Sequence, residues 1–252
     1  MARIAGARNC PECGLAVRIS LSDNSNLEWT NPRWQYFLAV AFAILIVGLL
    51  CRILGSAARW IIDLSFMNHH RLDTLTFGVC DRLSIILRTL WPFVAGIALC
   101  LLAKSEQRYP DKSRGSRMLM LGAGIFLCLV SLVYLAPRYQ LLPIGWTGYV
   151  IWRIVSDPWP SVVLAILGSA FSLELARRGN SRLLRKMSQL PLWPAAGGTV
   201  VWLFNIQRLF WPLRSIIWDW LFPLSMIAML VVTIRVLLRG ACEARLNWVT
   251  DP

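Results

Sequence analysis

The sequence predicts an all-α protein: a polytopic transmembrane helical bundle of about six spans, with a short N-terminal cysteine-knuckle segment. Three observations predict this class. Hydrophobic residues make up 57% of the 252 residues and charged residues only 15%, whereas a soluble domain carries about 25% charged residues. The mean hydropathy is positive, at +0.56. Polar residues also gather between apolar stretches that are long enough to cross a bilayer.

The apolar stretches divide the chain into three parts. Residues 1–33 form a polar segment with the cysteine knuckle, residues 34–240 contain the spans, and residues 241–252 form a tail. A bilayer core requires about 20 mostly apolar residues of helix. Stretches of this kind lie at about 34–54, 83–103, 118–137, 158–175, 192–207 and 219–238. The fifth contains Pro194, Gly197 and Gly198, so a re-entrant or interfacial segment is an open alternative there.

Basic residues predict the orientation. The formal charge is +13, from 26 basic and 13 acidic residues. Most basic residues fall in 1–33, 104–117, 177–191 and the tail, which share one side if there are six spans. The positive-inside rule then predicts a cell inner (cytoplasmic) membrane protein with both termini in the cytoplasm. The expected partner is the lipid bilayer, and assembly into a homo-oligomer is an open alternative. Binding of nucleic acid is not expected, because the arginines do not line one face.

The longest polar connection, residues 56–82, separates the first two predicted spans. Its charges are interspersed with apolar residues at helical spacing. We expect two short amphipathic helices that lie on the outer surface of the membrane. Trp60, Leu64 and Met67 share the apolar face of the first, and Leu72, Leu75 and Val79 that of the second.

Small residues and tryptophans mark the predicted spans in two further ways. One side of the fourth span carries small side chains, which allow another helix to approach closely. Gly122 and Gly124 of the third span are the expected contact on that helix. The small side consists of Ser161, Ala165, Gly168, Ser169 and Ser172. Tryptophans near the span ends predict an aromatic belt: Trp34, Trp91, Trp159, Trp193, Trp211 and Trp220.

The sharpest motif is Cys10-Pro11-Glu12-Cys13-Gly14. Two thiolates at this spacing can turn back onto one metal ion, and the glycine permits the tight turn. A structural zinc site needs a second pair of ligands, and the chain offers no second spaced cysteine pair. Three interpretations stay open: a degenerate zinc ribbon, a zinc ion shared between two chains, and another role such as a redox-active dithiol.

The N-terminal residues resemble a known group. The string NCPECGLAVRISL, a short polar stretch, and NPRWQ leading into an apolar helix resemble planctomycete-type multi-pass membrane proteins with an N-terminal CPxCG knuckle. The resemblance covers roughly the first forty residues. It implies a zinc-ribbon-like element followed by several transmembrane helices, and it implies no activity for particular residues. Many members carry two knuckles, whereas this chain has one.

A second candidate for metal or substrate binding is the group His69, His70 and Asp73. His69 and Asp73 lie at i and i+4, so on a helix both could face one ligand. The chain has two histidines, and both belong to this group. Asp63 and Asp81 are the candidates for a third ligand, although nothing in their spacing requires that role. The alternative, a polar break between two surface helices, is favoured.

Charged residues near the spans each have a structural explanation. The spacing of Glu174 and Arg178 predicts an ion pair on one helix. Asp219 lies in the first turn of the last predicted span, where the helix dipole favours a negative charge. Arg88 is expected to extend to the outer interface. Because the predicted spans have no acidic residue at their centres, a proton-coupled transporter is disfavoured.

The function predicted from the sequence is therefore coarse. No catalytic or transport motif is present, and a non-catalytic membrane component with a partner-binding or envelope role is favoured. The alternative is a small permease or channel subunit with its pore between helices. A membrane enzyme that uses His69, His70 and Asp73 on the outer face ranks third. A dry, close-packed interior would argue against a permease in the monomer.

Overall fold

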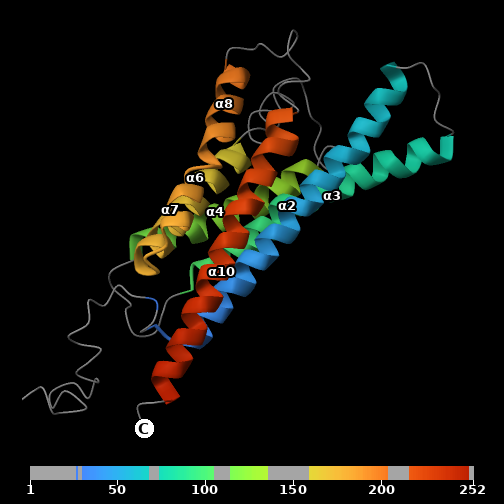
Figure 1. Ribbon diagram of the computed structural model, residues 1–252. Helices are drawn as coiled ribbons and strands as arrows, with labels where there is room; N and C mark the ends of the chain where they lie inside the picture. Colours follow the sequence, from blue (N-terminus) through green and yellow to red (C-terminus); the bar gives the residue numbers. More distant parts are fainter. Residues whose placement is uncertain are drawn as a thin grey trace, which may run out of the picture.

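The computed structural model describes residues 27, 30–67, 74–104, 114–135, 159–203 and 216–249. Within these ranges the chain is helical and contains no strand. Figure 1 shows the helices, which are α2 (Pro32–Met67), α3 (Thr74–Leu102), α4 (Arg114–Leu135), α6 (Trp159–Arg178), α7 (Arg182–Met187), α8 (Leu192–Leu203), the π-helix η3 (Ile216–Leu221) and α10 (Phe222–Val249). The all-α prediction is confirmed for this part of the chain.

Four of the described helices are long and apolar enough to cross a membrane, namely those at Pro32–Ser65, Leu75–Leu102, Trp159–Arg178 and Ile216–Arg245. Only 39–50% of the most apolar window of each is buried inside the protein. The remaining large apolar side chains would meet water in a soluble protein, whereas a lipid bilayer accommodates them. The apolar part of α4, Arg117–Leu132, is shorter, and α8 has 12 residues.

The predicted surface helices do not form separate elements. The first apolar stretch and the first amphipathic stretch are one 36-residue helix, α2, and the second amphipathic stretch is the beginning of α3. Gly55 does not break α2, because it lies where α3 approaches closely: a Cβ there would be 3.1 Å from the Leu87 Cβ and 3.2 Å from the Ser84 carbonyl oxygen. The expectation of two separate short helices is therefore wrong for the described residues.

The start of α2 follows from its local sequence. The Asn31 side-chain oxygen accepts a hydrogen bond from the Arg33 backbone N–H at 2.9 Å, which caps the first turn. Pro32 occupies the first helical position, where its missing N–H costs nothing. The helix N-terminus therefore lies where the predicted first span begins.

Contacts between helices fix their relative directions. Gln35 near the start of α2 lies against Gly240 near the end of α10, while Arg52 further along α2 lies over the Phe222 ring at the start of α10. These two helices are therefore antiparallel. Gly48 of α2 lies against Trp91 of α3, and the later Gly55 lies against the earlier residue Ser84, so α2 and α3 are also antiparallel.

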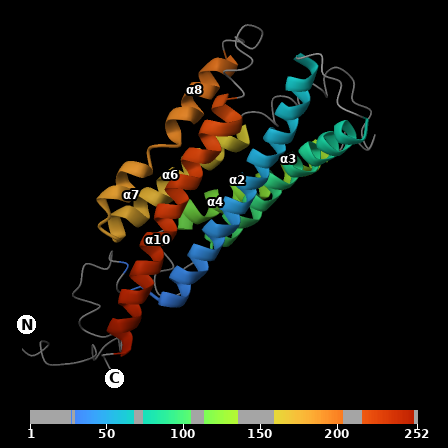
Figure 2. The same cartoon turned by 45° about the vertical axis from the view of Figure 1, so that its right-hand side comes forward.

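The remaining helices continue this alternation. Gly168 of α6 lies against Met226 of α10, and Gly179 at the end of α6 lies against Val236, so α6 runs parallel to α10. The next long helix, α8, contacts α6 and reaches Trp218 of η3 through Gly198, so it runs antiparallel to α6 and α10 (Figures 1 and 2). Because α4 is antiparallel to α3, the order α2, α3, α4, α6, α8, α10 alternates in direction.

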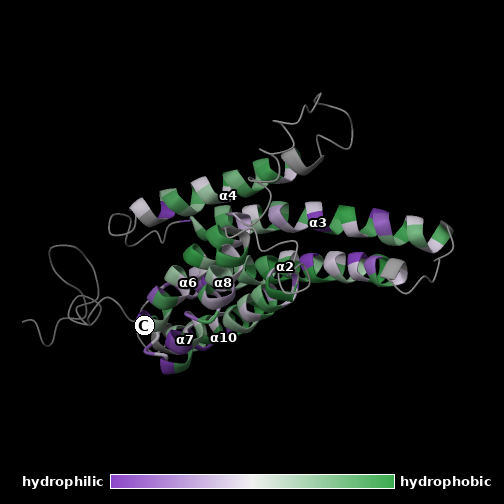
Figure 3. Cartoon of the chain, turned by 90° about the horizontal axis from the view of Figure 1, so that it is seen from above, coloured by the Kyte–Doolittle hydropathy of each residue, from purple (hydrophilic) through white to green (hydrophobic). Residues whose placement is uncertain are grey.

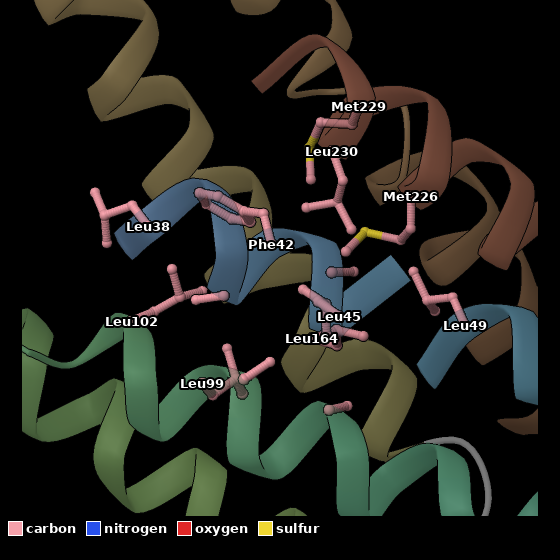
Figure 4. Close-up of a cluster of buried hydrophobic side chains, with 14 of the residues drawn as sticks. Leu38, Phe42, Leu45, Leu49, Leu99, Leu102, Leu164, Met226, Met229 and Leu230 are labelled. Atoms are coloured by element: carbon pink, nitrogen blue, oxygen red, sulfur yellow. The ribbon is translucent and has the colours of Figure 1, made fainter. Parts of the chain in front are cut away.

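The core lies where α2, α3, α6 and α10 meet. Leucines and one phenylalanine along α2 face α3, α6 and α10 at helical spacing (Figure 4). The side chains in the centre of this cluster are apolar and at most 1% exposed: Phe42, Leu45, Leu49, Leu99, Leu164, Met226, Met229 and Leu230. Close apolar packing therefore fills the middle of the described bundle.

The helices α3 and α4 approach each other closely where Gly96 meets Gly124. A Cβ on Gly124 would lie 2.6 Å from the Cys100 Sγ and 2.7 Å from the Gly96 carbonyl oxygen. A Cβ on Gly96 would in turn lie 2.6 Å from the Cys128 Sγ. Each cysteine thus packs on the glycine of the opposite helix, as small residues do in membrane helix pairs.

This contact corrects the expected pairing of the fourth span. Gly124 packs against Gly96 of α3, and a Cβ on Gly122 would meet no atom within 4 Å. The small side of α6 instead faces α10: Gly168 lies against the methionine side chains there, and the Thr233 hydroxyl donates to the Ser172 Oγ at 3.2 Å. The physical reason is that two small helix faces need not pair, because long methionine side chains fill a small face equally well.

Candidate functional site

The residues singled out as metal ligands, Cys10, Cys13, His69, His70 and Asp73, lie outside the described residues. Metal binding at either group stays a prediction. Within the described ranges no group of three or more His, Cys, Asp or Glu side chains is placed to hold a metal ion. The chemistry of the described part must therefore be sought elsewhere.

The most unusual charged residue of the described bundle is Arg52 in α2. Its side chain is buried, with 5% of the residue exposed. The Nη1 group donates a hydrogen bond to the Ser161 Oγ of α6. The guanidinium also lies over two aromatic rings, 4.6 Å from the Trp91 centroid of α3 and 5.5 Å from the Phe222 centroid of α10. We call Arg52, Trp91, Ser161 and Phe222 the Arg52 cluster.

The Arg52 cluster joins α2 to three other helices through one side chain. Burying a cation is costly unless hydrogen bonds and ring faces replace its water. The planar guanidinium suits this position because it stacks on rings while its N–H groups donate in the ring plane. Ser161 supplies an acceptor, and the rings of Trp91 and Phe222 supply their negative faces. The cluster thus holds the four helices together where the apolar core ends.

An ion pair joins α3 to the π-helix η3 that precedes α10. Arg88 of α3 and Asp219 of η3 are joined by an Nη2–Oδ2 contact of 3.4 Å, with the side chains 39% and 17% exposed. Arg88 follows Ser84 by one turn, and its Cγ would lie 3.2 Å from a Cβ on Gly55. Instead of extending freely to the interface, the Arg88 side chain thus connects α3 to η3.

The local backbone around Asp219 is a π-helix, Ile216–Leu221. Such wide turns are rare and often occur at functional positions. Here the turn places Trp218, which is 3% exposed, against α8: a Cβ on Gly198 would fall on the indole ring. The following residue, Asp219, then faces Arg88. Asp219 lies in the first turn of the last candidate span, as the sequence predicts, and the ion pair is an added role.

These side chains do not form a catalytic arrangement. An arginine is charged at every physiological pH and does not act as a general base. Ser161 accepts from Arg52, and no histidine lies among the described residues to take a proton from its hydroxyl. The predicted pair of Glu174 and Arg178 is confirmed, with 3.1 Å between the Arg178 Nε and the Glu174 Oε1. It lies on one helix and needs no function beyond local stabilisation.

Sequence reasoning missed the Arg52 cluster for an identifiable reason. Arg52 ends an uncharged apolar stretch, so it resembled a charge at the end of a span. The signal that would have found it is that Arg52 follows Leu45 and Leu49 at helical spacing and so lies on the same face as these core leucines. A single cation in the middle of an apolar helical face points inward. Trp91 was also misplaced: it is 6% exposed and packs under Arg52 and does not belong to an aromatic belt.

Comparison with protein-family models, with curated proteins and with solved structures finds no match to this chain. The resemblance of the N-terminal knuckle segment stays a prediction.

Proposed function

We propose that this chain is an inner-membrane component that crosses the membrane six times, has both termini in the cytoplasm, and binds a partner or serves the envelope without catalysing a reaction. The alternating direction of six helices supports the number of crossings. In this arrangement α4 is the third crossing and α8 the beginning of the fifth. Both lie outside the set of helices that are by themselves long and apolar enough to span.

The distribution of exposed cations supports the orientation. The start of α2, the end of α3, the end of α6 and the end of α10 lie at one end of the bundle, as their antiparallel contacts require. Basic side chains are exposed at this end, which the positive-inside rule would place in the cytoplasm. They are Arg33, Lys104, Arg177, Arg182, Arg185, Lys186, Arg239 and Arg245.

The observation that carries the non-transporting role is the apolar core. Transport sites lie near the middle of the bilayer and are built from polar groups, broken helices or charged side chains. In the middle of the described bundle the helices are unbroken, and buried leucine, phenylalanine and methionine side chains fill the space between them (Figure 4). The buried cation, Arg52, lies beyond this layer and is tied to Ser161.

Thiol accessibility tests this proposal. In a chain whose native cysteines are replaced, single cysteines at Leu45, Leu164 and Met226, each 0% exposed, should resist a membrane-impermeant maleimide applied to both faces. A cysteine at the exposed position Arg177 is the positive control and should react fully. Reaction at Leu164 and Met226 at a rate close to that at Arg177 would contradict a dry interior and favour a permease.

A second arm addresses a pore between copies of the chain. Val47 is 53% exposed on the outer side of α2, where we expect lipid. A cysteine at Val47 should therefore also resist the reagent. If Val47 reacts while Leu164 does not, water lies between protomers, and the chain is a channel subunit and not the non-transporting component proposed.

A further inference from the structure

The segment from Ser181 to Trp193, which we call the elbow, joins α6 to α8 and exposes two kinds of side chain. It comprises α7, the turn that follows it and the first two residues of α8. Three cations of α7 are exposed: Arg182, Arg185 and Lys186. Their spacing of three and four residues places them on one helical face. Between and after them lie large apolar side chains that are also exposed: Leu183 (57%), Leu190 (41%), Leu192 (37%) and Trp193 (77%).

Local structure holds the elbow in place. Asn180 adopts a left-handed conformation with φ of 45°, and the Ser181 backbone N–H donates to the Ala176 carbonyl at 3.0 Å, which ends α6. The Ser181 hydroxyl then accepts from the Leu184 N–H at 3.2 Å and caps α7. Leu184 is 0% exposed and anchors α7 to the bundle. The exposed side chains are therefore presented by a fixed backbone.

The surroundings of the elbow are also basic. Val236 of α10 lies against Gly179, two residues before the elbow, and the flanking residues Arg235 and Arg239 are exposed. The nearest acidic side chain along the chain, Glu174, is already paired with Arg178. Figure 3 shows hydrophilic residues gathered at α7, whereas α4 on the far side of the bundle is largely hydrophobic. The elbow thus has an excess of positive charge that suits an anionic partner.

We propose that the elbow binds the phosphodiester headgroups of anionic phospholipids at the inner membrane surface. The apolar side chains decide between a lipid and a soluble anion. A free phosphate offers nothing to Leu183 or Trp193, whereas a bilayer surface offers phosphate at one depth and acyl chains a few ångströms deeper. Tryptophan is the residue that favours this boundary. The inference goes beyond the proposed function, since an anionic lipid site would hold equally in a permease.

The test is lipid retention by the full chain, purified in an uncharged detergent and measured by native mass spectrometry. Wild-type protein titrated with phosphatidylglycerol should bind it more tightly than phosphatidylcholine. The double variant R182Q/R185Q should lose about thirtyfold in phosphatidylglycerol affinity, at roughly fivefold for each cation. The matched control R59Q/R82Q removes two exposed cations from the other end of the hairpin of α2 and α3 and should leave the affinity unchanged.

Two further measurements separate the sources of phosphate. The variant W193A should weaken retention of both lipids, because it removes the apolar contact and leaves the charges. Free glycerol phosphate at millimolar concentration should not displace the lipid. The proposal is overturned if the control variant loses as much affinity as R182Q/R185Q, if both lipids bind R182Q/R185Q as they bind wild type, or if glycerol phosphate displaces phosphatidylglycerol. The last result would indicate a site for a soluble anion.

Discussion

Replacing Gly124 by alanine is expected to lower the stability of the protein by about 2 kcal/mol. The new Cβ would lie 2.6 Å from the Cys100 Sγ and 2.7 Å from the backbone oxygen of Gly96. Backbone atoms cannot rotate away, so the cost is near the upper end for overpacking, about 3 kcal/mol. The higher helix propensity of alanine offsets about 1 kcal/mol of this.

The measurement is the thermal unfolding midpoint in detergent, followed by circular dichroism. A loss of about 2 kcal/mol corresponds to a decrease of about 4–8 °C for a chain of this size. Gly122 is the matched control: it lies on the same helix, and a Cβ there would meet no atom within 4 Å. Gly122→Ala should leave the midpoint unchanged or raise it slightly. Equal effects at both positions would show that α3 and α4 do not cross at Gly124.

Replacing Arg52 by alanine is expected to have the other large effect, a loss of about 3 kcal/mol. A hydrogen bond to a charged group contributes about 1.5–3 kcal/mol, and a desolvated cation–π contact about 2 kcal/mol. The relief of burying a charge offsets part of this sum. Truncation also leaves a cavity between α2, Trp91 and Phe222, because the guanidinium and its stem fill that space.

Two further variants identify what Arg52 contributes. Arg52→Met keeps most of the volume and removes the buried charge, so it should cost less than about 1 kcal/mol, as replacements of buried ions by apolar groups often do. Arg59→Ala is the surface control on the same helix: it removes an exposed pair with Asp63 at 3.3 Å and should cost less than about 1 kcal/mol. A midpoint for Arg52→Ala equal to that of wild type would contradict the clustering of four helices around this side chain.

The helical membrane architecture could be predicted because it depends on local sequence. Apolar stretches at about 34–54, 83–103, 158–175 and 219–238 coincide with the four helices that are long enough to cross a membrane. The sequence around Asn31 and Pro32 marks the start of α2 for the same local reason. The third and fifth predicted spans fall on α4 and α8, whose crossing of the membrane stays a prediction.

Helix ends and helix partners could not be predicted, because they depend on neighbours that are distant in sequence. In the sequence, Gly55 beside Ser56 indicates the end of a helix. In the structure α3 packs on Gly55, and α2 continues for about three more turns. The small face of α6 is visible in the sequence, but nothing in the sequence says that Met226 and Met229 will fill it. Arg52 has the same ambiguity: a cation after an apolar stretch reads as a span end until Ser161, Trp91 and Phe222 are brought around it.

In the proposed arrangement, six helices of alternating direction cross the membrane and leave both termini in the cytoplasm. Reporter fusions after residues 112, 145, 183 and 252 test it most directly, with a reporter that distinguishes cytoplasmic from external positions. We expect the fusions to report inside, outside, inside and inside, because α8 carries the chain across once more before α10 returns it. A C-terminal fusion that reports outside, with the fusion after 183 inside, would show that the segment beginning with α8 does not cross, and would contradict the six-crossing arrangement.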